Sequence, residues 1–187
     1  HGVFRRQRQM CIRDRNHSEA LSLIDKKLIK LAGNIILEAI NQDKSVFWCG
    51  NGGRASQANH LSAELVGGMY QKKINPFKSI CLNVDSAFIT AWSNDDSFNN
   101  IFLRQLGALG ASGDILIGLS TSGNSSNIIK AAQFARSNRM KVISLTGNDG
   151  GLLKKHSDVN INIPTSSTQR IQEMHILIGH ILCDIIE

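Results

Sequence analysis

Apolar residues recur along this chain in two alternating patterns. Between Ser18 and about Asn41 they follow a helical period, at Leu21, Ile24, Leu28, Leu31 and Ile35. The next segment, SVFWCG (45–50), is a short continuous apolar run that ends in glycine, which is typical of a buried strand. The alternation then continues, with strands predicted in 79–84, 114–120, 141–147 and 159–164, and helices from about 54 and in 86–109, 125–138 and 167–186.

Strands that alternate with helices predict a three-layer α/β fold around a central parallel sheet of about five strands. We find no linker or internal repeat, so residues 16–187 are expected to form a single domain. Ligands of such sheets bind where strands end and helices begin. Polar residues and glycines gather at two of these junctions, 49–55 and 120–127.

The net charge of +6 is concentrated at the start of the chain. Residues 1–15 hold five Arg and one Asp, a net of +4, which leaves +2 for the rest. RQMCIRDR (8–15) resembles translated adapter sequence, so we interpret residues 1–15 as a disordered or non-native tail. Without this tail, nothing indicates a nucleic-acid partner.

The four cysteines, Cys11, Cys49, Cys81 and Cys183, are far apart and form no CxxC pair. This spacing favours reduced thiols of a cytoplasmic protein over a disulfide or zinc-finger framework. No apolar run is long enough to cross a bilayer and no signal peptide is recognisable, so no membrane partner is expected.

The segment STSGNS (120–125) follows a predicted strand and precedes a predicted helix. Its hydroxyls, its glycine and the free N–H groups at the helix start favour binding of an anion. The alternative is an ordinary capped turn, for which one serine is enough. No G-K-[ST] motif is present, so a phosphorylated small molecule fits better than a nucleotide triphosphate.

The segment GNGGRA (50–55) matches the loose dinucleotide pattern G-x-G-x-x-A. That pattern needs an acidic residue about 20 positions further on, whereas the first candidate, Asp85, lies about 30 positions beyond Gly53. We therefore rank a nicotinamide cofactor below a sugar phosphate.

The helix after the Gly-rich segment carries Gln57, His60 and Glu64 on one face. For Gln57 alone, a polar face exposed to solvent is a sufficient explanation. His60 and Glu64, four residues apart, also have the spacing of two metal ligands or of a base and its partner.

The last helix places polar groups among apolar residues. We interpret His175 as a core histidine that bonds a backbone carbonyl, or as a supporting residue, because a desolvated imidazole needs a partner. Glu173 is expected to pair with Arg170. Gln172 and His180 are candidates for a site shared with the other helix.

Taken in order, the motifs CGNGG, HxxxELVG, ND, STSGNS, LTGxDGG and RIQEMHILIxH resemble the sedoheptulose 7-phosphate isomerases of the sugar-isomerase (SIS) superfamily. The resemblance covers about 18–187. It implies a flavodoxin-like sheet, a homotetramer with active sites at subunit interfaces, and the conversion of a seven-carbon ketose phosphate to D-glycero-D-manno-heptose 7-phosphate, towards activated heptose for lipopolysaccharide or capsule.

The resemblance also implies roles for particular residues. Glu64 and His180 correspond to the catalytic base and acid. The residues that correspond to zinc ligands are His60, Glu64, Gln172 and His180. The residues that correspond to substrate contacts are Asn51, Gly52, Gly53, Asp95, Ser120, Thr121, Ser122, Ser125 and Gln172.

One difficulty concerns Gln172 and His180, which would be about 12 Å apart along a continuous helix. Either the helix begins after Gln172, or neighbouring subunits share the metal site.

Three positions depart from the family pattern: Arg54 replaces Ser, Gln57 replaces Asp and Gly68 replaces Arg. Our hypothesis is that Arg54 supplies the cation lost at position 68. The departures leave open an SIS isomerase for a different phosphosugar. A non-catalytic SIS module that binds a sugar phosphate or a protein is the alternative of another class.

Overall fold

The computed structural model describes residues 2–70 and 75–187, with side chains from Gln7 onward. Its centre is a sheet of five parallel strands in the order β2-β1-β3-β4-β5. The strands are β1 (Val46–Gly50), β2 (Ser79–Cys81), β3 (Ile115–Ser120), β4 (Lys141–Gly147) and β5 (Val159–Ile163). This order is the flavodoxin-like one, so the predicted fold class is confirmed.

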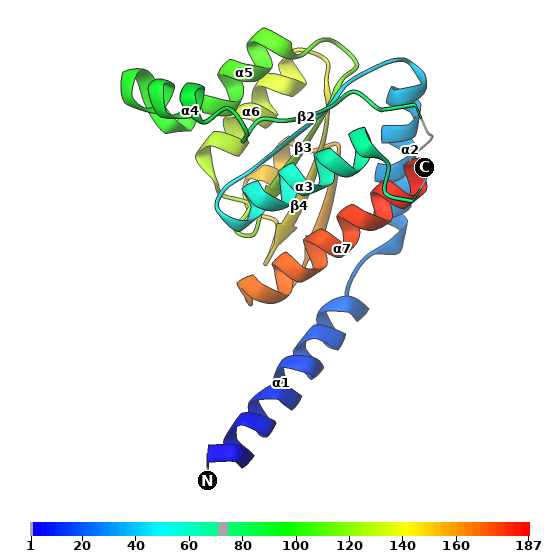
Figure 1. Ribbon diagram of the computed structural model, residues 1–187, viewed down its shortest axis with the longest axis vertical. Helices are drawn as coiled ribbons and strands as arrows, with labels where there is room; N and C mark the ends of the chain where they lie inside the picture. The colour runs from blue at the N-terminus through cyan, green and yellow to red at the C-terminus, as the bar shows by residue number, and fades with distance from the viewer. Residues whose placement is uncertain (1, 71–74) are drawn as a thin grey trace.

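Helices cover both faces of the sheet (Figure 1). One face packs against α2 (Lys26–Asn41), α3 (Gly53–Gly67) and α7 (Thr168–Ile186), and the other against α5 (Ile101–Leu109) and α6 (Ser126–Ser137). Neighbouring strand residues point to opposite faces, so Trp48 lies in the first core and Phe47 in the second. Both faces are buried, which explains the continuous apolar runs of the strands.

Strand β1 pairs with β2 on one side and with β3 on the other. The order of the strands reverses at this point, so the chain segments that leave β1 and β3 turn away from each other. Such a switch point opens a crevice at the carboxyl ends of the strands. Both junctions singled out in the sequence lie there.

The helix predicted over 18–41 is two helices, α1 (Gly2–Ser22) and α2. The side chain of Asp25 accepts a hydrogen bond from the Lys27 amide at 2.9 Å and caps α2. The predicted helical segment 86–109 is divided into α4 (Ser86–Trp92), a π-helical turn η1 (Ser93–Ser97), a 3-10 turn η2 (Phe98–Asn100) and α5. Strand β2 is shorter than predicted, and a further 3-10 turn, η3 (Leu153–His156), was not expected.

Residues 2–15 belong to α1, which differs from the expected disordered tail. The helix projects from the body of the domain, and its last turns lie against α7 (Figure 1). Whether residues 1–15 are native stays a prediction. Among the described residues, no helix combines the length and apolarity that a bilayer crossing requires.

Candidate active site

The Gly-rich junction, residues 50–54, is held at the end of β1. The Asn83 side chain accepts from the Gly50 amide at 3.1 Å and donates to its carbonyl at 2.8 Å. Gly52 has a φ of 59°, a conformation that glycine adopts without strain, and it leads directly into α3. The backbone of this junction is therefore exposed at the crevice and fixed on its strand side. Sequence reasoning missed Asn83, because the predicted strand 79–84 included it, whereas the observed strand ends at Cys81.

The Ser loop, residues 120–125, follows β3. The hydroxyls of Ser120 and Ser125 hydrogen-bond each other at 3.0 Å. Ser125 precedes α6 but its side chain caps none of the helix amides. The start of α6 therefore keeps free N–H groups, which together with the dipole and the hydroxyls of Thr121 and Ser122 suit an anion.

A turn formed by residues 147–153 holds the Ser loop in place. The Gly147 amide donates to Thr121 O at 3.1 Å and the Leu153 amide donates to Gly123 O at 2.8 Å. Gly123 has a φ of 65°, and a Cβ added there would lie 2.0 Å from Gly150 O. The glycines of the LTGxDGG motif thus allow close backbone contact, and two backbone hydrogen bonds fix the Ser loop to this turn.

The two junctions are joined by a pair of amides. Asn51 and Asn127 donate to and accept from each other, both at 2.9 Å. Asn51 precedes the Gly turn and Asn127 lies in the first turn of α6, so this contact spans the crevice between β1 and β3. Sequence reasoning did not find Asn127, which is buried despite its amide.

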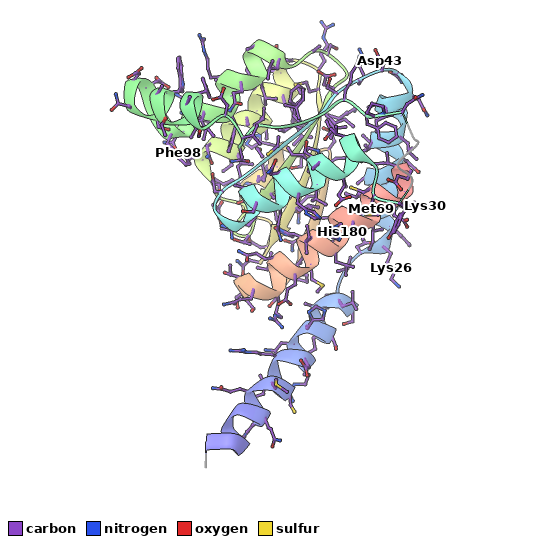
Figure 2. All side chains as sticks on the ribbon, viewed as in Figure 1. Lys26, Lys30, Asp43, Met69, Phe98 and His180 are labelled. Atoms are coloured by element: carbon purple, nitrogen blue, oxygen red, sulfur yellow. The ribbon has the colours of Figure 1, made fainter. Side chains whose placement is uncertain are left out.

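A polar cluster lies between α3 and α7, where Figure 2 labels His180. His60 Nε2 is 2.9 Å from His180 Nε2 and 3.3 Å from Glu64 Oε1. The potential metal-ligand atoms of these three residues all lie within 4.8 Å of one another. The structure therefore brings together both predicted catalytic residues.

The close approach of the two helices depends on Gly179. A Cβ there would lie 2.3 Å from Leu61 Cδ1. The side chains of His60 and Glu64 are 49% and 25% exposed, so the cluster remains open to solvent and to a ligand.

Gln172 is not part of this cluster within one chain. Helix α7 begins before Gln172, so the first of the two alternatives raised from the sequence is wrong. The Gln172 side chain lies at the Gly turn, with Nε2 3.5 Å from where a Cβ of Gly53 would be. The backbone carbonyl of Gln172 accepts from Gln57 Nε2 at 2.8 Å, so the interpretation of Gln57 as a solvated residue is also wrong.

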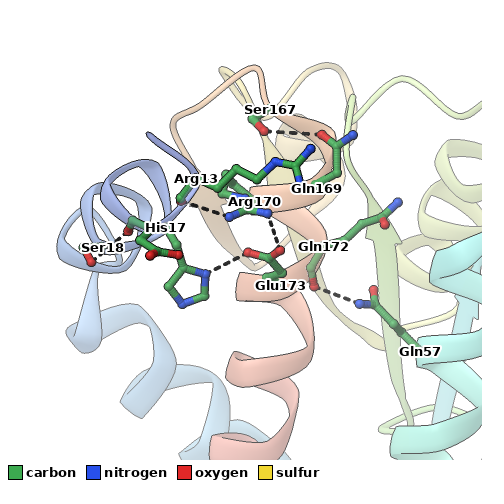
Figure 3. A network of polar contacts seen from close by, with 10 residues as sticks. Arg13, His17, Ser18, Gln57, Ser167, Gln169, Arg170, Gln172 and Glu173 are labelled. Atoms are coloured by element: carbon green, nitrogen blue, oxygen red, sulfur yellow. Dashed lines mark hydrogen bonds and ion pairs between the residues drawn. The ribbon is translucent and has the colours of Figure 1, made fainter. Parts of the chain in front are cut away.

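Figure 3 shows these glutamines beside the contact between α1 and α7. Glu173 pairs with Arg170 Nη2 at 2.5 Å, as expected from the sequence. Its other oxygen lies 2.7 Å from His17 Nδ1. The side of α7 that carries Glu173 therefore anchors α1.

Asp95 lies in the π-helical turn η1 and is exposed. Its only hydrogen bond among the described residues comes from the neighbouring Asn94, at 2.9 Å. Within one chain the structure does not bring Asp95 into contact with the other candidate residues.

His175 is fully buried and Nε2 donates to Thr146 O at 3.1 Å, as predicted. Burial, opposed by the hydrogen bond and assisted by the charge of Arg54, lowers its pKa from 6.5 to about 4. The unfolded chain therefore takes up a proton first as the pH falls.

We expect the free energy of unfolding to be unaffected by this group above pH 6.5 and to decrease by roughly 3 kcal/mol as the pH falls from about 6.5 to about 4. Urea unfolding at a series of pH values measures this change. The variant His175→Gln should show a flatter profile over this range, and an equally steep profile in the variant would contradict the assignment.

Comparisons with known proteins agree with this geometry. A family model described as SIS domain matches residues 15–147. The phosphoheptose isomerase of Leptospira biflexa is 51% identical over 162 residues, which cover 85% of this chain and 82% of the relative. Phosphoheptose isomerase structures from Neisseria gonorrhoeae and Francisella tularensis cover 100% of this chain and 98% of theirs, with 36% and 33% identity and TM-scores of 0.89 and 0.91. The chain therefore belongs to the phosphoheptose isomerases, within the SIS domain family.

Proposed function

We propose that this enzyme converts sedoheptulose 7-phosphate to D-glycero-D-manno-heptose 7-phosphate. The observation that carries the proposal is the convergence of His60, Glu64 and His180 between α3 and α7. A protein that only binds a sugar phosphate does not need the Glu64 carboxylate and the His180 imidazole to lie together against His60. The names and identities of the relatives support the same reaction.

The reaction moves a carbonyl from C2 to C1 through an enediol. Glu64 takes a proton from C1 and returns it to C2, and His180 carries the hydroxyl proton from O1 to O2. The protons balance, so no external oxidant or reductant is required. The Ser loop binds the phosphate and so fixes the position of the sugar chain.

We propose a zinc ion held by His60, Glu64 and His180. Two imidazole nitrogens and one carboxylate oxygen form a common ligand set for catalytic zinc, in which neighbouring ligand atoms are roughly 3.3 Å apart. The separations of 2.9 and 3.3 Å around His60 Nε2 fit this geometry. An ion held through Glu64 Oε1 and His180 Nε2 would leave Glu64 Oε2 and His180 Nδ1 as the atoms that exchange protons with the substrate. When bound, zinc supplies Lewis-acid stabilisation of negative charge on the substrate oxygens.

Zinc binding can be measured by calorimetry on protein treated with a chelator. We expect about one zinc ion per chain in the wild type, and an affinity at least about 100-fold lower in His60→Ala. His156→Ala, which removes an imidazole from η3, serves as the matched control. Equal affinity in His60→Ala and the wild type would contradict the site.

Gln172 and Asp95 support a homotetramer whose active sites lie at subunit interfaces. Within one chain, Gln172 is about 12 Å from His180 along α7, and the hydrogen bond of Asp95 is to Asn94 and not to the cluster. Both residues could then serve a site completed by a neighbouring subunit, with Gln172 as a fourth zinc ligand.

We place the reaction in the cytoplasm, as a step towards activated heptose for lipopolysaccharide or capsule. The free cysteines Cys49, Cys81 and Cys183 are consistent with a reducing compartment.

The decisive assay incubates purified protein with sedoheptulose 7-phosphate, with and without zinc, and follows the aldose product. Unphosphorylated sedoheptulose is the control and should react poorly. Saturable binding of the phosphosugar without turnover would contradict the proposal and favour a non-catalytic module. Turnover of a different ketose phosphate alone would change the substrate and keep the reaction.

A further inference from the structure

The guanidinium of Arg54 lies over the Gly turn. Arg54 is the second residue of α3, and its backbone is packed so closely on β1 that a Cβ at Gly50 would be 2.7 Å from the Arg54 carbonyl. Its Nη2 atom is 3.7 Å from where a Cβ of Gly52 would lie. The side chain thus folds back across the turn, and its charge is held at the crevice between β1 and β3.

This charge has no counter-ion in the part of the chain that the structure describes. No ion pair or hydrogen bond to the guanidinium is formed there, although the residue is partly buried. Glu64, on the same helix, is ten residues away, which is about 15 Å along the axis. A partly desolvated cation without a partner is unfavourable, so its position is best explained by an anion that binds there.

The Ser loop lacks a cation of its own. It offers hydroxyls and the free amides of α6, and residues 120–127 include no Lys or Arg. The next cation, Lys130, donates to Asn100 Oδ1 at 2.8 Å. The amide pair between Asn51 and Asn127 joins the Gly turn to the Ser loop, so Arg54 places a cation at this crevice.

We propose that Arg54 binds the phosphate group of the substrate together with the Ser loop. A guanidinium donates two parallel N–H bonds to two phosphate oxygens, while the hydroxyls and amides of the Ser loop bind the remaining oxygen. The proposal rests on the function proposed above and assigns to Arg54 the selection of a phosphorylated over a neutral sugar.

The test measures inorganic phosphate binding by calorimetry and kinetics with sedoheptulose 7-phosphate, for the wild type and for Arg54→Gln and Arg54→Lys. We expect Arg54→Gln to raise both the Kd for phosphate and the KM by about 10- to 100-fold, and Arg54→Lys to be intermediate. Arg136→Gln removes the same charge from the far end of α6 and should leave both constants unchanged. Thermal unfolding verifies that each variant is folded.

The possible outcomes distinguish a failure of the role proposed for Arg54 from a failure of the proposed isomerase activity. Normal turnover with an unchanged KM in Arg54→Gln overturns the role of Arg54 and leaves the isomerase standing. Phosphate binding that depends on Arg54, without turnover of any ketose phosphate, supports the anion site and overturns the isomerase. A wild type that neither binds phosphate nor turns over phosphosugar overturns both.

Discussion

Replacing Glu64 with Gln is expected to lower kcat for sedoheptulose 7-phosphate by about 10²- to 10⁴-fold, the usual contribution of a positioned general base. The amide has nearly the shape of the carboxylate but cannot accept the C1 proton. Because the side chain is partly exposed and its contact with His60 is at 3.3 Å, the fold should tolerate the change. The measurement is steady-state kinetics combined with thermal unfolding.

The matched control is Glu38→Gln, which removes an exposed carboxylate from α2 and should keep the wild-type kcat. Bound zinc is determined in both variants, so that a lost ion is distinguished from a lost base. A decrease in kcat of less than about tenfold in folded, zinc-loaded Glu64→Gln would exclude Glu64 as the base.

Gly123→Ala should have the largest effect on the Ser loop. A left-handed conformation costs an alanine about 1–2 kcal/mol, and the contact of 2.0 Å with Gly150 O adds about 1–3 kcal/mol of overpacking. We expect a Tm lower by roughly 5 to 15 °C and weaker phosphate binding, because the loop and the 147–153 turn must separate.

Gly67→Ala is the control for this substitution. Gly67 is the last residue of α3, has no positive φ, and no atom lies within 4 Å of the added Cβ. That variant should be as stable as the wild type or slightly more so. If Gly123→Ala unfolded at the same temperature as Gly67→Ala, the close contact in the Ser loop would be refuted.

Much of the fold follows from local patterns, but its interruptions do not. The apolar period continues through Leu21, Ile24 and Leu28, so periodicity alone joins α1 to α2, and only Asp25, as an N-cap, indicates the break. The polar residues of 93–100 likewise disfavour a regular helix. The prediction of a helical segment over 86–109 did not take them into account.

The candidate site was predictable where its residues share one element. His60 and Glu64 lie four residues apart on α3, so their contact follows from helix geometry. The contact of His180 with His60 depends on how α7 crosses α3 at Gly179, which no local pattern contains. The resemblance supplied that pairing. It left Asn83 and Asn127 unassigned, because Asn83 bonds the backbone of Gly50 and Asn127 bonds the side chain of Asn51.

The packing of Gly123 against Gly150 and Gly151 has a consequence for the history of this chain. Two peptide segments in backbone contact leave no room for either to gain a side chain alone. A lineage that replaced one of these glycines would first have to lengthen or redirect the opposing segment. The two stretches therefore evolve as a unit, and insertions are expected to accumulate at other edges of the domain.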